Sequence, residues 1–323
     1  MKGAAICDGA HFHLLDHLAP LCYYLNLPLI TDHPLSYQLA KTYYPQIKTL
    51  LIEEDYLSFL ADQYDVLITT SRFTSEELGH LLYEIKGKKM KFLFTPHGNS
   101  DKGIEIFKHQ THVLIYGEQM RERLSSLPLT LISMGNLRYQ FYQEQRPFYD
   151  TLFHTTKKTV LYAPTWNDEE KLTSFFKMYT HLIETLPPSL HLIIKLHPLL
   201  EKYYPSECYY LLGQGEIHKN LTVLHEFPPI YPLLAKTDYY LGDYSSIGYD
   251  FLSFNRPLFF IDKPDSQAFL HQYGTCLNQP IFNAIEHYQD TLTPFRTNAY
   301  SFVFDPPKNS VLLKEECKAA LQL

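Results

Sequence analysis

Short apolar runs alternate with helix-like segments along most of the chain, and this alternation constrains the fold more than any other feature of the sequence. In the first part of the chain the runs predict buried strands at residues 3–7, 28–31, 47–52, 66–70, 92–95, 113–116 and 130–134. Helical patterns lie between several of these runs, at residues 14–25, 75–85 and 118–127. The second of these ranges begins at Ser75, which with Glu76 and Glu77 has the start signals of an amphipathic helix. Strands and helices in this order form a parallel sheet that is covered by helices on both faces.

The same alternation stops and then starts again, which indicates two domains. Residues 139–147 carry no strand or helix pattern, and we interpret them as a connection between domains. A second set of strands is then expected at residues 159–163, 190–196, 221–224, 239–241 and 257–261, with helices at 175–186 and 246–254. We therefore predict an α/β fold of two Rossmann-like domains that face each other across a cleft, at residues 1–146 and 147–305. The helical segment 306–323 is expected to pack back on the first domain.

Charge and cysteine usage exclude several classes of protein. The net charge of −7 opposes a nucleic-acid binder, which usually has a basic surplus. The five cysteines form no C-x-x-C pair, which is typical of reduced thiols in the cytosol. The N-terminal residues reach Asp8 before any signal-peptide core develops, and no stretch approaches the roughly 18 apolar residues that span a bilayer. We expect a cytoplasmic protein with at most peripheral contact at the inner face of the membrane.

Polar residues follow four of the predicted strands at the point where each strand ends. His97 follows the strand at 92–95, Thr165 the strand at 159–163, His197 the strand at 190–196, and the segment Asp243–Ser246 the strand at 239–241. The carboxyl ends of parallel strands meet at one edge of a sheet, where ligands bind. We therefore predict that these residues belong to the functional site.

The residue types at these ends suggest particular roles, each with a structural alternative. Ser245 and Ser246 open a predicted helix, whose N-terminus favours an anion such as pyrophosphate, although Asp243 or Ser245 could simply cap that helix. His97 could act as a general base. His197 could donate to a phosphate oxygen and stabilise a departing nucleotide. Either histidine could instead be hydrogen-bonded to a loop for structural reasons.

The histidine-rich segment after the first strand invites a metal interpretation that the sequence does not complete. His13 and His17 are four residues apart on one helical face, as in half of a zinc site. No H-E-x-x-H motif or suitable third ligand follows. The favoured interpretation is that His11 and His13 line the cleft. The sequence also has no Gly-x-Gly-x-x-Gly, Walker A, Gly-x-Ser-x-Gly or Asp-x-Asp motif, so neither a bound metal nor a resident cofactor is expected.

Taken together, the motifs resemble the CDP-glycerol glycerophosphotransferase family, whose members prime and polymerise teichoic-acid chains. The matching strings are His97-Gly98 with Lys102-Gly103, Met134-Gly135-Asn136-Leu137-Arg138, Tyr162-Ala163-Pro164-Thr165-Trp166, Lys195-Leu196-His197-Pro198, and Asp243-Tyr244-Ser245-Ser246 through Asp250-Phe251 to Arg256-Pro257. They cover residues 97–261 in the family's order, whereas the first ninety residues match only in general pattern.

The resemblance implies a metal-independent enzyme of the GT-B architecture, with the donor nucleotide in the C-terminal domain and the acceptor in the N-terminal one. It implies that His97 is the base and that His197, Ser245 and Ser246 hold the pyrophosphate. Asp243 would cap a helix or bind a ribose hydroxyl. Two further sets follow from it, Thr165 and Arg256 on the donor side, and His11, His13 and Lys102 in the acceptor cleft.

The sequence departs from the family at two positions. Pro96 stands where the family usually has Trp, and Asn167 where it usually has Arg, which removes a fixed cation. We expect a transferase that moves a glycerophosphate-like group from a CDP-linked donor to a polyol-phosphate or glycan-lipid acceptor. The alternatives are a UDP-sugar-dependent glycosyltransferase or epimerase of the same fold, and a non-catalytic relative that binds nucleotide or glycan.

Overall fold

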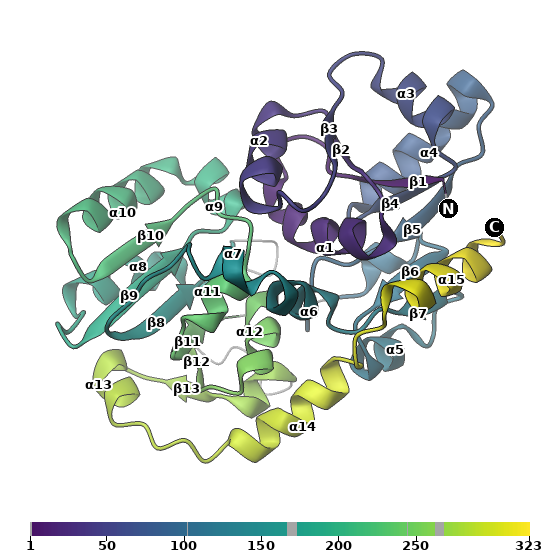
Figure 1. Ribbon diagram of the computed structural model, residues 1–323. Helices are drawn as coiled ribbons and strands as arrows, with labels where there is room; N and C mark the ends of the chain where they lie inside the picture. The colour runs from purple at the N-terminus through teal and green to yellow at the C-terminus, as the bar shows by residue number, and fades with distance from the viewer. Residues whose placement is uncertain (1, 102, 167–172, 244, 262–267) are drawn as a thin grey trace. The chain divides into compact units, whose positions relative to one another are not determined.

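The computed structural model describes residues 2–101, 103–166, 173–243, 245–261 and 268–323. The chain divides into two compact units (Figure 1). Unit 1 comprises Met1–Glu144 and Ser301–Leu323, and unit 2 comprises Gln145–Tyr300. The sequence analysis placed these boundaries at residues 146 and 305. Each unit is described by itself below.

Unit 1 is built on a seven-stranded parallel sheet in the order β3-β2-β1-β4-β5-β6-β7. The strands are β1 Gly3–Ile6, β2 Leu29–Thr31, β3 Thr49–Leu51, β4 Val66–Thr69, β5 Lys91–Phe94, β6 His112–Ile115 and β7 Thr130–Ser133. Each of the seven predicted strands is confirmed to within a few residues. All residues of β1 and β4 are buried, as expected for central strands covered on both faces.

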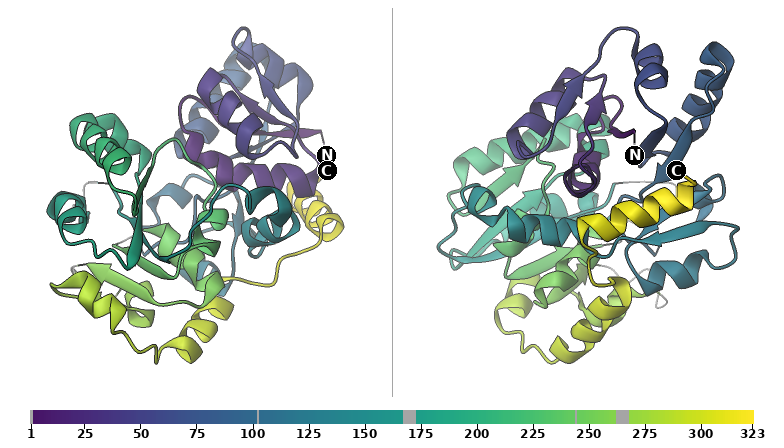
Figure 2. Two further views of the ribbon diagram at one scale, coloured as in Figure 1. Left: turned by 60° about the vertical axis from the view of Figure 1, so that its left-hand side comes forward. Right: turned by 45° about the vertical axis from the view of Figure 1, so that its right-hand side comes forward.

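Helices connect these strands, and the C-terminal segment returns to them. The helices of unit 1 are η1 Phe12–Leu14, α1 Leu15–Leu25, α2 Pro34–Tyr43, α3 Tyr56–Gln63, α4 Arg72–Lys86, η2 Glu105–Phe107, α5 Glu118–Leu124, α6 Leu137–Glu144 and α15 Ser310–Leu321. The last helix, α15, packs on α1 and β7. Lys91 donates from Nζ to the Leu321 carbonyl, which places the end of α15 beside β5. The start of β1 and the end of α15 lie close together in every view (Figure 2).

Two predictions about helices in unit 1 are wrong. The segment 139–147 does contain the boundary between the units, after Glu144, but it was expected to have no helix, and most of it belongs to α6, in which Phe141 and Tyr142 are buried. The helical pattern of this segment is weak among its Gln and Glu residues, because the buried aromatic residues cover only one side of the helix. Ser75 was expected to start a helix, but it lies inside α4 and its hydroxyl donates to Gln110 Oε1 at 3.3 Å.

Unit 2 has a six-stranded parallel sheet in the order β10-β9-β8-β11-β12-β13. Its strands are β8 Lys158–Ala163, β9 Leu190–Lys195, β10 Leu221–Leu224, β11 Tyr239–Gly242, β12 Leu258–Ile261 and β13 Thr275–Leu277. Its helices are α7 Arg146–Tyr149, α8 Phe175–Glu184, α9 Pro198–Tyr203, α10 Pro205–Ile217, α11 Tyr231–Ala235, α12 Ser246–Phe251, η3 Leu252–Phe254, η4 Leu270–Tyr273 and α13 Ile281–Glu286; α14 Thr293–Val303 leads back into unit 1. The sequence analysis found the first five strands and missed β13.

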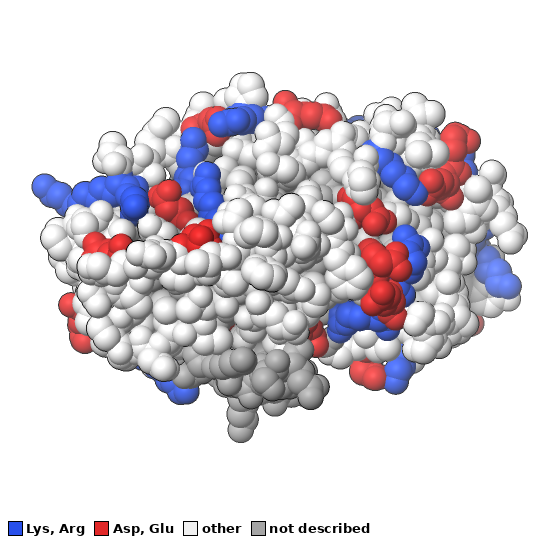
Figure 3. Space-filling view, turned by 90° about the horizontal axis from the view of Figure 1, so that it is seen from below, with Lys and Arg blue, Asp and Glu red and all other residues white. Residues whose placement is uncertain are grey.

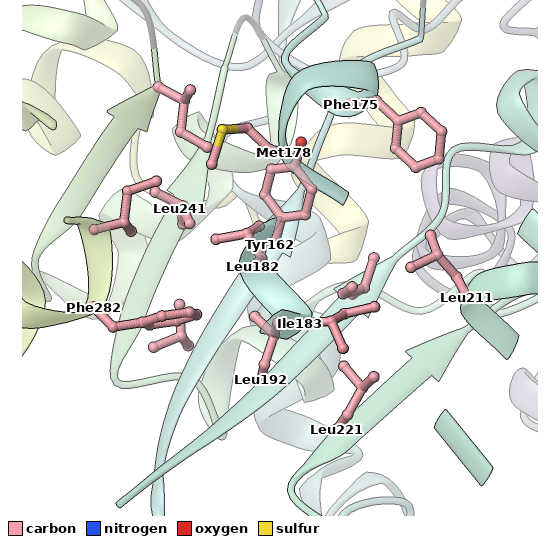
Figure 4. Packing of buried hydrophobic residues seen from close by; sticks show 14 of the residues in the cluster. Tyr162, Phe175, Met178, Leu182, Ile183, Leu192, Leu211, Leu221, Leu241 and Phe282 are labelled. Atoms are coloured by element: carbon pink, nitrogen blue, oxygen red, sulfur yellow. The ribbon is translucent and has the colours of Figure 1, made fainter. Parts of the chain in front are cut away.

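Helix α8 closes one face of this sheet (Figure 4). Its buried residues Phe175, Met178, Leu182 and Ile183 recur at the spacing that places them on one side of a helix. They pack with strand residues such as Leu192 from β9 and with residues of α13 in one cluster. This packing holds the start of α8 near the end of β8.

The order of strands reverses once in each sheet. In unit 1 the chain builds outward from β1 to β3 and then from β4 to β7, so the reversal lies between β1 and β4. In unit 2 it lies between β8 and β11. Ligands of open α/β sheets bind outside the carboxyl ends of the strands at such a reversal. The carboxyl ends of the strands at these two reversals are therefore the expected ligand-binding sites.

The surface carries charges of both signs. On the face that Figure 3 shows, Lys and Arg are interspersed with Asp and Glu among uncharged residues, and neither sign forms a broad field. Among the helices of the described ranges, none has the length and apolar character that a membrane crossing requires.

Candidate functional site

In unit 2 a buried carboxylate joins the two strands that flank the reversal. Asp243, directly after β11, accepts a hydrogen bond at Oδ1 from the Thr165 backbone N–H after β8, at 2.8 Å. Its Oδ2 accepts from the N–H and the hydroxyl of Ser174, both at 2.9 Å. Asp243 is only 2% exposed. Its carboxylate thus holds the ends of β8 and β11 and the start of α8 in one arrangement.

The same carboxylate acts on two nearby phenols. Burial, and then the negative charge of Asp243, raise the pKa of Tyr162 and of Tyr240 far above its ordinary value. Tyr162 shares a hydrogen bond of 2.9 Å with the Ser174 hydroxyl. Both phenols therefore stay neutral beside Asp243.

The serines that follow Asp243 start a short helix at the reversal. Ser245 is the N-cap of α12, and its hydroxyl accepts from the Ile247 N–H at 3.4 Å. Asp243 does not take this capping role, one of the two expected for it. The predicted helix 246–254 consists of α12 followed by the 3-10 helix η3. Ser245 and Ser246 are both half-buried at the strand edge where a ligand is expected.

His197 is fixed at the end of the neighbouring strand β9. It is the N-cap of α9, and its Nδ1 accepts from the Leu199 N–H at 3.1 Å. Because Nδ1 is the acceptor, the hydrogen of the neutral ring is on Nε2. The ring also stacks on Trp166, which follows Thr165, with centroids 6.5 Å apart and planes at 27°. His197 therefore presents an oriented Nε2–H donor.

Arg256 lies at the other edge of this sheet, which corrects the expectation that it binds donor phosphate. It precedes β12, and its Nη1 donates to the carbonyls of Ala235, at 3.0 Å, and Thr237. Ala235 is the last residue of α11, and Thr237 lies between α11 and the start of β11. The reason for Arg256 before Pro257 is thus structural: the guanidinium satisfies backbone acceptors at a helix C-terminus.

The sequence analysis missed a perturbed carboxyl group on α9. Burial raises the pKa of Glu201 to about 7, although the positive charge of Lys195 opposes this rise and Glu226 adds to it. Lys195 is the last residue of β9, two residues before His197. The group could not be found from the sequence, because its pKa depends on neighbours from other loops.

In unit 1, His97 is an exposed residue of the loop that follows β5, and its ring contacts that of a second histidine. Its ring is edge-to-face with that of His17 on α1, with centroids 6.4 Å apart and planes at 83°. Tyr116, directly after β6, donates its hydroxyl hydrogen to the Pro96 carbonyl at 3.0 Å. The same hydroxyl lies 3.2 Å from His17 Nδ1. In the sequence, His17 stands out only as half of a candidate metal site.

Of the three other residues expected in the acceptor cleft, the structure describes His11 and His13. His11 and His13 follow β1 and lie together, with ring centroids 6.0 Å apart. Lys102 and Asn167 lie outside the described residues. No group of three or more His, Cys, Asp or Glu among the residues that the structure describes could hold a metal ion.

A family model matches the part of the chain that contains the site of unit 2. The model described as CDP-Glycerol:Poly(glycerophosphate) glycerophosphotransferase matches residues 138–293. The resemblance that the motifs indicated is thereby confirmed. Comparison with curated proteins gives no match.

Solved structures confirm the fold class. The chain is similar to the wall teichoic acid polymerase TagF soaked with CDPG, with a TM-score of 0.65, 14% identity, and coverage of 99% of this chain and 89% of that one. It is also similar to MnaA of S. aureus with UDP (TM-score 0.62, 13% identity, 100% and 98% covered). A third is a putative UDP-N-acetylglucosamine 2-epimerase from Listeria monocytogenes (TM-score 0.59, 12% identity, 99% and 95% covered). At these identities the likeness shows a shared fold of two parallel-sheet α/β units.

Proposed function

We propose that this chain transfers a glycerophosphate-like group from a CDP-linked donor to an acceptor hydroxyl, without a metal ion. The family match supports a glycerophosphotransferase-type enzyme, and it includes Thr165, His197, Ser245 and Ser246. Those residues stand at the ends of three adjacent strands of unit 2, at the reversal of strand order. Unit 2 is therefore the donor-binding unit of this proposal.

The orientation of His197 is the observation that carries the proposal. A donor pyrophosphate offers only acceptor oxygens, so a partner of fixed geometry must present hydrogen. The Leu199 N–H holds Nδ1 of His197 as an acceptor, so that the neutral ring carries its donor hydrogen on Nε2. Such a fixed donor stabilises charge that develops on a departing phosphate. Ser245 and Ser246 supply further hydroxyls at the same strand edge.

His97 is the proposed base on the acceptor side. It removes the proton of an acceptor hydroxyl, whose oxygen attacks the phosphorus that bears the glycerol group. The new P–O bond forms as the bond between that phosphorus and the CMP oxygen breaks. CMP leaves with the electron pair, His197 stabilises its charge, and the proton remains on His97 until solvent takes it. The products are the extended acceptor and CMP.

Donor binding is the first test. Calorimetric titration of the protein should detect CDP-glycerol and CMP, with UDP-sugars binding more weakly. The His154→Ala variant is a control that should bind these nucleotides like the wild type, because His154 is exposed and precedes β8. If neither cytidine nor uridine nucleotides bind at millimolar concentration, the proposal is wrong.

The second candidate function is a UDP-sugar enzyme of the same fold. The similarity to MnaA with UDP and to a putative 2-epimerase favours it. Mass analysis of products separates the candidates, because a glycerophosphotransferase adds the mass of glycerophosphate to a polyol-phosphate or glycan-lipid acceptor, whereas a UDP-sugar glycosyltransferase adds the mass of a sugar. An epimerase leaves the mass of the nucleotide sugar unchanged.

A further inference from the structure

His17 and His97 are joined through one tyrosine. His17 comes from α1, Tyr116 follows β6, and His97 follows β5. The Tyr116 hydroxyl contacts His17 Nδ1 at 3.2 Å and the carbonyl of Pro96, the residue before His97, at 3.0 Å. The His17 ring meets the His97 ring directly. His17 therefore touches His97 and, through Tyr116, the backbone that carries it.

The number of hydrogens available to these hydrogen bonds determines the tautomer of His17. A phenol has one hydrogen, and Tyr116 donates it to Pro96. The bond between Tyr116 and His17 therefore needs a hydrogen on His17 Nδ1. The neutral ring then carries its lone pair on Nε2. This tautomer is the reverse of the one at His197.

The surroundings of His17 keep the ring neutral. Burial lowers the pKa of His17 well below 6.5, and the positive charge of Arg138, with that of His97 and His13 when they are protonated, lowers it further. These groups come from α6, from the loop after β5 and from η1. The adjacent Asp16 does not offset them, because its carboxylate pairs with Arg138 and accepts from Tyr44 at 2.9 Å.

We propose that His17 is a positioning residue for His97, which it holds through ring contact and through Tyr116. The proposal rests on the role of His97 as the base. A neutral His17 orients the His97 ring and does not repel the proton that His97 accepts. The hydrogen bond from Nδ1 to Tyr116 keeps the Pro96 carbonyl, and with it the start of the His97 loop, in place.

Three substitutions of His17 separate positioning from simple packing. Asn places an amide N–H near the position of Nδ1, Gln places one near Nε2, and Phe keeps the ring without nitrogen. We expect His17→Asn to retain kcat within about threefold, and His17→Gln and His17→Phe to lose about tenfold. The KM for the donor should not change. Tyr116→Phe should lose kcat like His17→Phe, and His80→Asn, on the exposed side of α4, should match the wild type.

A packing role alone predicts the opposite order, with Phe the best substitute and Asn the poorest. Wild-type kcat in His17→Phe, or no advantage of Asn over Gln, would overturn the proposal. If His97→Ala keeps full turnover, the assignment of the base fails instead. If His97→Ala is inactive while His17→Phe is normal, only the positioning role fails.

A measurement on the unsubstituted protein covers the case in which the variants do not fold. Nitrogen-15 NMR of the labelled protein should show His17 with hydrogen on Nδ1 and none on Nε2 from pH 6 to pH 8. A ring that is protonated at both nitrogens at pH 6, or that carries its hydrogen on Nε2, contradicts the proposal.

Discussion

Two histidines, His197 in unit 2 and His17 in unit 1, have rings with opposite tautomers. In unit 2 a backbone N–H makes Nδ1 of His197 an acceptor, so the neutral ring carries its hydrogen on Nε2. In unit 1 a tyrosine hydroxyl makes Nδ1 of His17 a donor, which leaves Nε2 without hydrogen. The first form suits a phosphate oxygen, and the second suits a neutral neighbour of a base. The partner of Nδ1, more than the location of the histidine, decides what the ring can do.

The two strand edges also differ in what holds them together. Unit 2 uses the buried carboxylate of Asp243, which accepts from backbone and hydroxyl groups. Unit 1 uses a buried ion pair, in which Arg138 donates from Nε to Asp16 at 2.9 Å. Arg138 ends the motif Met134–Arg138, so the structure gives a packing reason for that string. A carboxylate thus ties β8, β11 and the start of α8 together in unit 2, and α1 to α6 in unit 1.

The largest expected effect is the loss of the base. His97→Ala should lower kcat by about a thousandfold, because general base catalysis contributes on this scale. Donor binding should stay within about threefold of the wild type, since His97 lies in unit 1. Turnover with a natural donor and calorimetry measure the two quantities, and His80→Ala is the control. Loss of donor binding in His97→Ala would place this histidine on the donor side and end the contrast between the units.

The second prediction tests the tautomer of His197. His197→Ala should lower kcat by about a hundredfold, the scale of losing one donor to a developing charge. His197→Gln should keep more activity than His197→Asn, because only the Gln amide reaches the position of Nε2. The reverse order, measured by steady-state kinetics, would show that Nδ1 is the working atom.

The third prediction concerns the carboxylate of unit 2. Asp243→Asn turns one oxygen into an N–H group that faces a donor, so one buried hydrogen bond is lost. We expect the free energy of unfolding to fall by about 2 kcal/mol, as measured by urea denaturation. The matched control is Asp238→Asn, because Asp238 accepts from the Thr159 N–H at the other end of the same two strands and is less buried. If both substitutions lower the free energy of unfolding equally, the buried carboxylate of Asp243 stabilises the unit no more than that of Asp238.

The smallest effect is a pH dependence at Glu201. The pKa is about 7 in the folded chain and ordinarily 4.5, so the folded state holds a proton that the unfolded chain releases. The free energy of unfolding should therefore fall as pH rises from about 4.5 to about 7. Glu201→Gln removes this dependence, and we expect it to add about 1 kcal/mol at pH 8, allowing for solvent screening at a partly exposed group. Thermal or urea unfolding measures this quantity. If the free energy of unfolding of Glu201→Gln falls between these pH values as steeply as that of the wild type, Glu201 is not the group responsible.

The expected strands and strand ends were accessible from local pattern. Runs such as 66–70 and 190–196 are apolar because both faces of a central parallel strand are buried, and that requirement is written in consecutive residues. The placement of His97, Thr165, His197 and Ser245 directly after strands followed from the same reasoning. The helix at residues 137–144 was missed because its buried side is narrow.

The roles of Arg256, His17 and Glu201 could not be predicted from local pattern. The donation from Arg256 to the Ala235 and Thr237 carbonyls places it away from the phosphate edge, although its Arg-Pro sequence matched the family string. His17 and Tyr116 are 99 residues apart, so no spacing rule could join them. The pKa of Glu201 depends on Lys195 and Glu226 from separate loops.

By itself, the sequence determined two parallel-sheet units and the strand ends that carry chemical groups, because hydrophobic periodicity and chain direction are local properties. The tertiary structure decided which groups meet there and in which protonation form. Hydrogen-bond partners and burial come from residues far apart in the chain, and they set the tautomers of His17 and His197 and the role of Asp243.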